Sequence, residues 1–317
     1  MATTYVKWKN RKTMTDNEWV EARRSGIGGS DAGSVIGMNP YGSPYTVYYD
    51  KTTPNSQKEV SENMRQGTDL EEYVARRFCE ETGKKVKRFD WILRSKANPF
   101  MIADVDRMIV GENAILECKT TLNRDNYSFV GDDIPAYWKA QCLHYMSVTG
   151  AQKVYLSVLV FGTGFHVVEI DRETNASDIC ALENIERDFW KNHVEKEIPP
   201  VIDGSDRATA LLASQYPEAN NGLPPVDLTM CDSELERLAE IKVQMRTLDE
   251  EKSAIENSIK QVLGEAAEGE CNGYSVTWKN RTSNRFDTKR FQEDHADLYA
   301  AYVTPTNTRT FLFKVRK

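Results

Sequence analysis

Two neighbouring segments carry side chains whose types and spacing suit the hydrolysis of phosphodiesters. Asp106 opens a short apolar stretch, and the apolar run that follows ends in Glu117, Cys118 and Lys119. If the two segments pair as a hairpin, Asp106 and Glu117 come together. Glu117 and Lys119 then share a face, because side chains two apart in a strand point the same way. The spacing therefore predicts two carboxylates and one ammonium group at one point of a sheet.

These groups match what the hydrolysis of a phosphodiester requires. Negative charge develops on the phosphoryl and leaving oxygens, and hard divalent cations held by carboxylates neutralise it. The pattern predicts a Mg²⁺ site, with Mn²⁺ as a substitute, although a hairpin with merely solvated charges shows the same residues. Asp104 shares a face with Asp106 and is the alternative ligand. We favour Asp106 because it lies closer to Glu117 in the expected register.

A helix is predicted over residues 67–78, upstream of this hairpin. Leu70, Val74 and Phe78 follow helical spacing, and Glu71 lies early in the helix beside the apolar stripe. An acidic residue in a first turn is favoured by the helix dipole alone. The alternative is that Glu71 is a third carboxylate of the site.

A second helix is predicted over residues 136–146, downstream of the hairpin, where Pro135 suits a helix start. Gln141 and Tyr145 are four residues apart and so lie on one face. They are either satisfied polar groups of a buried helix or supports of the site. A strand rich in β-branched and aromatic residues is expected to follow at 153–161.

A glycine-rich turn precedes all of these segments. Gly26, Gly28 and Gly29 free the backbone for close approach to a ligand, and Ser30 stands before a short predicted helix at 32–36. Backbone N–H groups at that helix start, together with Arg24 and Ser30, would form a phosphate pocket. No Gly-Lys-Ser/Thr follows, so the turn is not a nucleotide P-loop.

In this order the segments resemble the PD-(D/E)xK nucleases of the RecB and lambda-exonuclease branch. The run Gly-Ile-Gly-Gly-Ser-Asp resembles the opening of the YqaJ-type viral recombinase exonucleases. The resemblance covers about residues 20–200. It implies an α/β (α+β) fold, with a restriction-endonuclease-like core in which helices flank a central mixed sheet.

The resemblance also implies residue roles. The implied catalytic set comprises Glu71, Asp106, Glu117, Lys119, Gln141 and Tyr145. The implied metal ligands are Asp106, Glu117, the backbone carbonyl of Cys118, and Glu71 either directly or through water. Lys119 corresponds to the lysine that positions water, and Arg24 and Ser30 to the pocket for a DNA 5′ phosphate. The chain departs from the pattern at Val105 and Arg107, where many members have proline and glycine.

The activity implied by the resemblance is 5′→3′ digestion of double-stranded DNA from its ends. The 3′ single strands that remain serve phage-type homologous recombination by single-strand annealing. An annealing protein would be a partner, the enzyme would form a trimeric ring, and a phage or prophage gene would place it in the cytoplasm of a bacterial host. The alternatives are an endonuclease of the same superfamily and a catalytically silent adaptor that binds DNA ends or the annealing protein.

The composition fits an intracellular enzyme that binds DNA locally. The six cysteines are scattered without a Cys-x-x-Cys pair, which argues against zinc or iron–sulfur sites and for a reducing compartment. The sequence shows no signal peptide and no run that approaches a membrane span. The net charge is −7, yet residues 1–53 carry +2 and residues 272–317 carry +5, so local basic patches are available for DNA.

The sequence predicts two parts joined by a linker. Residues 1–200 carry the catalytic pattern, and residues 201–230 contain the prolines and glycines of a linker and loops. Residues 231–317 begin with a long helix whose apolar positions follow a 3-4 spacing over four heptads. This helix can pair within the chain, with another subunit or with a partner. A small basic α+β module follows, with strands expected at 274–279 and 310–315 and helices between them.

Overall fold

The computed structural model describes residues 3–54, 61–305 and 308–315, and it divides into two compact units, one ending at Gln215 and one beginning at Tyr216. Helix α7 (Asp206–Gln215) forms within the segment expected to be linker and loops, and it belongs to the first unit. Two contacts hold α7 against the first unit: Ala208 is fully buried, and Arg207 pairs with Asp50 at 2.8 Å.

The first unit is built on a five-stranded mixed sheet. In spatial order its strands are β2 (Val86–Arg88), β5 (Arg107–Ile109), β6 (Ala114–Thr121), β7 (Lys153–Val160) and β8 (Gly164–Asp171). β6 and β7 are parallel, and the other neighbours are antiparallel. The parallel pair needs a crossover connection, which α5 (Ala136–Thr149) supplies. This arrangement confirms the predicted mixed sheet flanked by helices.

The first unit also contains a smaller antiparallel sheet, whose last strand comes just before β5 in the sequence. It consists of β1 (Tyr5–Asn10), β3 (Trp91–Ser95) and β4 (Ile102–Ala103), in the order β1-β3-β4. Residues 104–106 link β4 directly to β5 of the large sheet. The predicted hairpin is therefore present as β5 and β6, with Asp106 immediately before its first strand.

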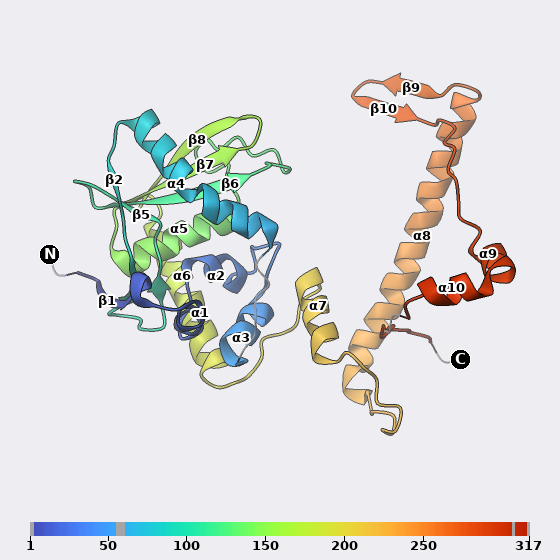
Figure 1. Ribbon diagram of the computed structural model, residues 1–317, viewed down its shortest axis with the longest axis horizontal. Helices are drawn as coiled ribbons and strands as arrows, with labels where there is room; N and C mark the ends of the chain where they lie inside the picture. The colour runs from blue at the N-terminus through green and yellow to red at the C-terminus, as the bar shows by residue number, and fades with distance from the viewer. Residues whose placement is uncertain (1–2, 55–60, 306–307, 316–317) are drawn as a thin grey trace. The chain divides into compact units, whose positions relative to one another are not determined.

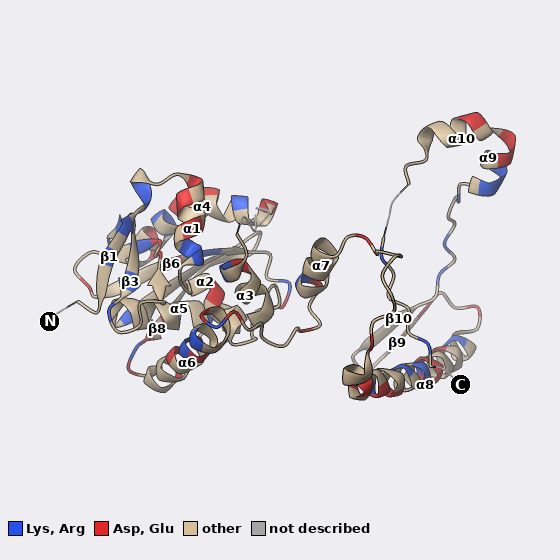
Figure 2. Ribbon diagram, turned by 90° about the horizontal axis from the view of Figure 1, so that it is seen from below, with Lys and Arg blue, Asp and Glu red and all other residues tan. Residues whose placement is uncertain are grey.

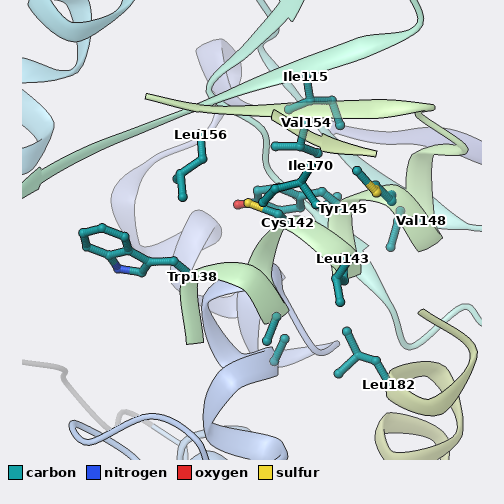
Figure 3. Packing of buried hydrophobic residues seen from close by; sticks show 14 of the residues in the cluster. Ile115, Trp138, Cys142, Leu143, Tyr145, Val148, Val154, Leu156, Ile170 and Leu182 are labelled. Carbon is teal, nitrogen blue, oxygen red and sulfur yellow. The ribbon is translucent and has the colours of Figure 1, made fainter. Parts of the chain in front are cut away.

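Helices cover both faces of the large sheet (Figure 1). One face packs against α5, which in turn contacts α2 (Gly29–Val35) and α6 (Ala176–Phe189). Ile115, Val154 and Leu156 point from the sheet into this layer (Figure 3). The other face packs against α4 (Glu62–Thr82) through Leu116 and its neighbours. Strand alternation places Glu117 on the side of Ile115, so its side chain faces α5.

Local signals set the ends of the helices. The remaining helices of the first unit are η1 (Arg11–Thr13), α1 (Asp16–Arg24), α3 (Pro44–Thr52) and the π-helical turn η2 (Trp190–Val194). Thr15 and Glu18 form a reciprocal capping box at α1. Gly83 and Gly150 end α4 and α5 with φ of 69° and 70°, a left-handed conformation that glycine adopts without strain.

The second unit consists of one long helix with small elements around it. These are η3 (Thr229–Cys231), α8 (Asp232–Leu263), the hairpin of β9 (Glu268–Cys271) and β10 (Tyr274–Thr277), α9 (Thr288–Asp294) and α10 (Ala296–Tyr302). The strand predicted at 310–315 is not formed, because residues 308–315 pair with no strand of the described chain. Within the described residues, no helix is long and apolar enough to cross a membrane.

Candidate active site

The site is centred where the loop after β4 meets β6. Asp106 accepts a hydrogen bond through Oδ2 from the backbone N–H of Cys118 at 2.8 Å. This bond ties the carboxylate to the strand that carries Glu117 and Lys119. The paired strands β5 and β6 set its register, with Arg107 opposite Leu116. The predicted approach of the two segments is confirmed by this contact.

Glu117, Lys119 and Gln141 form a closed hydrogen-bonded set. Lys119 Nζ donates to Glu117 Oε1 at 2.7 Å and to Gln141 Oε1 at 2.8 Å, while Gln141 Nε2 donates to the same Glu117 oxygen at 2.7 Å. Gln141 also donates to the Tyr145 hydroxyl at 3.0 Å, and that hydroxyl donates to the Asp104 carbonyl. The prediction that Glu117 and Lys119 share a face, and that Gln141 and Tyr145 share another, is confirmed.

One oxygen of this set has no partner. Glu117 is 2% exposed, and its Oε2 is a buried oxygen with no hydrogen bond in the described structure. A buried carboxylate oxygen without a partner is costly, because it has lost its water without replacement. A cation next to Oε2 would remove that cost. This oxygen is the atom of the site that most directly fits a metal ligand.

The local electrostatics also favour a cation. Burial, then repulsion from Glu117 and Glu71, raises the pKa of Asp106 well above its usual value. Burial likewise raises the pKa of Glu117, against the opposing effect of Lys119. Burial alone would lower the pKa of Lys119, but Glu117 and Asp106 raise it overall. The ammonium form of Lys119 is therefore favoured by the two carboxylates beside it.

Glu71 lies at the edge of the site and is held by an arginine. Arg107 is 3% exposed and donates to Glu71, to Glu72 at 2.7 Å and to the carbonyl of Asp106. It thus neutralises the third carboxylate and braces the loop that carries the first. Sequence reasoning did not assign Arg107 to the site. The sequence feature that could have indicated its role is that Arg107 stands where many members of the resembled family have glycine.

Asp104 and Asp106 have different surroundings. The Asp104 carboxylate pairs with Arg11 at 3.2 Å and accepts from the indole N–H of Trp19 at 3.3 Å. Asp106 instead contacts the strand of Glu117 through the backbone of Cys118. Asp106 thus lies against the strand of Glu117, whereas the Asp104 carboxylate connects its loop to η1 and α1.

At the glycine-rich turn, the structure places Arg23 rather than Arg24 beside Ser30. Arg23 donates to the Ser30 hydroxyl and lies over the face of Trp19 at 5.1 Å. Arg24 pairs with Glu21 at 2.7 Å. Arg23 and Ser30 both line the cleft that contains the carboxylates, and Arg24 does not. Arg23 is therefore the arginine beside Ser30 in this cleft, which Arg124 also lines.

The turn itself is fixed by a buried ion pair and by tight packing. Lys51 Nζ donates to Asp31 at 2.6 Å and to the Arg23 carbonyl at 2.8 Å, while Asp31 accepts from the backbone N–H of Gly28. A Cβ on Gly29 would lie 2.5 Å from the ring of Tyr145. Glycine is required there because the turn packs directly on α5. The Arg23 pocket and the Gln141–Tyr145 face are thus parts of one rigid surface.

These groups line a single cleft of the first unit. Its walls include Arg23, Ser30, Glu71, Asp104, Asp106, Glu117, Cys118, Lys119, Gln141 and Tyr145. In the described part of the chain, no three His, Cys, Asp or Glu side chains are grouped closely enough to hold a metal ion. The carboxylates of Asp106 and Glu117 and the backbone carbonyl of Cys118 would offer a divalent cation the oxygen ligands that Mg²⁺ prefers.

Two comparisons find proteins related in sequence to this chain. A model of the YqaJ-like viral recombinase domain matches residues 18–152. The uncharacterized protein YqaJ of Bacillus subtilis (strain 168) is 37% identical over 308 residues, and the match covers 95% of each chain. The match therefore includes both units.

Solved structures show more distant likenesses. The alkaline exonuclease LHK-Exo of Laribacter hongkongensis is 17% identical, with 63% of this chain and 99% of that chain covered and a TM-score of 0.45. A phage-related exonuclease of Haemophilus somnus 129PT is 14% identical, with 54% and 96% covered and a TM-score of 0.40. In both cases the match spans nearly the whole of the solved chain and between half and two thirds of this one.

Proposed function

This chain belongs to the YqaJ-like viral recombinase family, and we propose that it is a Mg²⁺-dependent exonuclease acting on double-stranded DNA. We propose that it digests the 5′-ended strand and leaves 3′ single strands for annealing. Mn²⁺ would substitute for Mg²⁺, because both accept oxygen ligands. The observation that carries this proposal is the set of Glu117, Lys119 and Gln141 beside Asp106, with one Glu117 oxygen left unpaired.

Each side chain of the set has a distinct task. Asp106 and Glu117 would hold the cation with the Cys118 carbonyl. When bound, the cation supplies charge neutralisation to the phosphoryl oxygens and lowers the pKa of a water. Lys119 would donate a hydrogen bond to that water and so orient it toward phosphorus. Gln141 fixes the ammonium group through its Oε1 at 2.8 Å.

The proposed end-recognition pocket is made by Arg23, Ser30 and the glycine-rich turn. A 5′ phosphate would receive charge-assisted hydrogen bonds from the Arg23 guanidinium and a hydrogen bond from the Ser30 hydroxyl. Both side chains line the same cleft as Glu117. A terminal phosphate held there would place a phosphodiester further along the strand near the carboxylates. This arrangement supports digestion from an end over cleavage within a strand.

The partners follow from the same proposal. The protein would load on the ends of linear duplexes, and a single-strand annealing protein would receive the 3′ strands in the cytoplasm of a bacterial host. The net charge of −7 does not oppose DNA binding, because residues 1–53 carry a local charge of +2 and contribute Arg23 to the cleft.

The test is digestion of a linear duplex labelled separately at its 5′ and 3′ ends, beside a closed circle, with and without Mg²⁺. Early loss of the 5′ label, retention of the 3′ label on long strands and an intact circle are expected. Cleavage of the circle would establish an endonuclease instead. Retained end binding without any cleavage would establish a DNA-end adaptor.

The pocket has its own test, with two arginines as a matched pair. Arg23→Ala should abolish the preference for 5′-phosphorylated over 5′-hydroxyl ends. Arg24→Ala should keep that preference, because Arg24 pairs with Glu21 and lies outside the cleft. If Arg24→Ala removes the preference and Arg23→Ala does not, the pocket is wrongly assigned.

A further inference from the structure

The helix α8 presents an uncovered apolar stripe to solvent. We call its 3-4 spaced positions the seam: Leu238, Ile241, Met245, Leu248, Lys252, Ile255, Ile259 and Val262. Leu248 is 63% exposed and Val262 86%, and no residue described in α8 is buried. A regular apolar stripe of this length is not stable in water by itself, since helices owe most of their stability to packing of such a face.

The spacing and the flanking charges define what covers the seam. Apolar residues that alternate three and four apart over four heptads are the pattern of a coiled coil of two or more helices. Acidic and basic residues lie along the rest of α8 (Figure 2). The chain's own C-terminal segment approaches the helix at Lys242, where Phe313 lies 4.8 Å from the ammonium group. That contact leaves Leu248 and the seam residues beyond it exposed.

We propose that α8 pairs with α8 of a second copy of this chain, in antiparallel orientation, with the helices crossing near Glu250. In this register every seam residue meets a seam residue of the other copy. The facing pairs are Leu238 with the partner's Val262, Ile241 with the partner's Ile259, Met245 with the partner's Ile255, and Leu248 with the partner's Lys252.

Lys252 selects the antiparallel orientation. In a parallel pair in register, Lys252 would face the partner's Lys252 in one layer of the seam, and two like charges would be desolvated together. In the antiparallel pair it faces the partner's Leu248 instead. The partner's Asp249 and the partner's Glu251 flank that leucine and supply the opposite charge. The Lys252 ammonium groups of the two copies thus offset the negative charges of Asp249 and Glu251 near the crossing point.

The charges beside the seam select the same orientation. The antiparallel register sets Lys242 against the partner's Glu256, and twofold symmetry produces a second, equivalent contact. A parallel pair would set Lys242 against the partner's Arg237, and Glu256 against the partner's Glu251, so both contacts would repel. The antiparallel register also brings Asp249 against the partner's Asp249 and Glu251 against the partner's Glu251, and the two Lys252 ammonium groups lie beside these carboxylates. The Lys242–Glu256 contacts therefore favour the reversed copy over a parallel one. This proposal does not depend on the nuclease activity.

The first test is the mass of the full-length protein by sedimentation over a micromolar concentration series. Leu248→Asp should halve the mass, because it places a carboxylate in the centre of the seam. Val243→Asp is the matched control: Val243 is 66% exposed on α8 but lies off the seam, so the mass should not change. A native protein that is a monomer throughout the series would overturn the proposal. A mass that Leu248→Asp leaves unchanged would also overturn it, because that result is expected of a ring held together by the first units alone.

Charge reversal then tests the orientation. Lys242→Glu or Glu256→Lys alone should weaken the pair about tenfold, because two attractions become two repulsions. The double variant, which carries both changes, should restore it. A parallel pair would respond with the opposite sign, since each single change would create an attraction. If the seam is covered by the chain's own tail, none of these changes alters the mass, and the proposal is wrong.

Discussion

The two units of this protein differ in which side chains occupy an unfavourable environment. The first unit buries charge: Glu117, His144 and Glu186 are 2%, 0% and 0% exposed. The second unit exposes apolar side chains, with Leu248 at 63% and Val262 at 86%. Each arrangement costs free energy in the unit considered alone. The difference lies in where the compensation comes from.

In the first unit the compensation is already present within the chain. Lys119 and Gln141 satisfy one oxygen of Glu117, and His144 satisfies Glu186 at 2.8 Å. Among the described Glu117, Lys119, Gln141, His144 and Glu186 side chains, only Oε2 of Glu117 is buried without a hydrogen-bond partner. In the second unit the proposed compensation is the α8 helix of a second copy. The unpaired oxygen of Glu117 supports the proposed cation site, and the exposed apolar surface of α8 supports the proposed pairing.

The largest effect is expected from removing the ammonium group of the cleft. Lys119→Ala should lower the rate of digestion by about 10³-fold, because the attacking water loses its orientation. Binding of a linear duplex should survive, since Arg23 and Ser30 are unchanged. Lys139→Ala is the matched control on α5, where Lys139 pairs with the exposed Asp132. Unchanged turnover in Lys119→Ala would remove this lysine from the mechanism.

The buried pair of His144 and Glu186 should give the largest effect on folding. His144 Nε2 must donate, because its partner is the carbonyl of Ile102 at 2.8 Å, so the second proton is shared between Nδ1 and Glu186. His144→Phe leaves a buried carboxylate and a carbonyl unpaired, and we expect a loss of about 3–5 kcal/mol in the free energy of unfolding. Glu186→Gln can keep both contacts with a neutral ring and should cost less.

The pH dependence of this pair has a definite sign. Burial alone would lower the pKa of His144, but Glu186 and the Ile102 carbonyl raise it overall. A raised pKa in the folded state gives stability that is present below the unfolded pKa and is lost as the pH rises through the folded pKa. Urea unfolding followed by tryptophan fluorescence measures this in the first unit, which holds five of the six tryptophans. A pH-independent difference between native protein and Glu186→Gln would contradict the assignment.

Much of the site could be predicted because its parts are local. Asp106, Glu117 and Lys119 lie on one hairpin, and strand alternation alone places the last two on one face. The helices α4 and α5 follow from apolar periodicity and from Pro135, and both are present. The central mixed sheet was expected from the resemblance, and the parallel pairing of β6 with β7 confirms it.

The remainder depends on rotations and contacts that a sequence does not contain. Arg23 and Arg24 are neighbours on α1, and one residue of a helix is a turn of about 100°, so a one-residue shift moves the side chain off the cleft. Arg107 enters the site because Glu71 and Glu72 come from a distant helix. The strand expected at 310–315 had alternating apolar residues but no strand to pair with.

A pair of leucine substitutions compares the units directly. Leu116 is fully buried between β6 and α4, so Leu116→Ala should cost about 2–5 kcal/mol of the free energy of unfolding of the first unit. Leu248→Ala should leave that value within about 0.5 kcal/mol, because Leu248 lies exposed in the other unit. Tryptophan fluorescence in urea separates the two. Equal losses would show that the units do not unfold independently.

The smallest effect tests whether the carboxylates of the cleft are arranged for a cation. Burial and the charges of Glu117 and Glu71 raise the pKa of Asp106, so the folded protein without metal binds a proton that the unfolded chain releases. Stability therefore falls as the pH rises above the ordinary range of an aspartate. Asp106→Asn keeps the acceptor for the Cys118 N–H and removes the charge. At neutral pH without metal it should be more stable by on the order of 1 kcal/mol.

Mg²⁺ should reverse this order, because a cation that binds only the folded state stabilises it in proportion to its occupancy. The melting temperature of the native protein should rise with Mg²⁺, and more at higher pH, where the two carboxylates are ionised. Asp106→Asn should lose this response, whereas Asp104→Asn should keep it, because the Asp104 carboxylate is engaged by Arg11 and Trp19. If Asp104→Asn loses the response and Asp106→Asn keeps it, the ligand is Asp104. The cleft would then have to rearrange on binding, which would weaken the contrast between a preformed first unit and a second unit that awaits its partner.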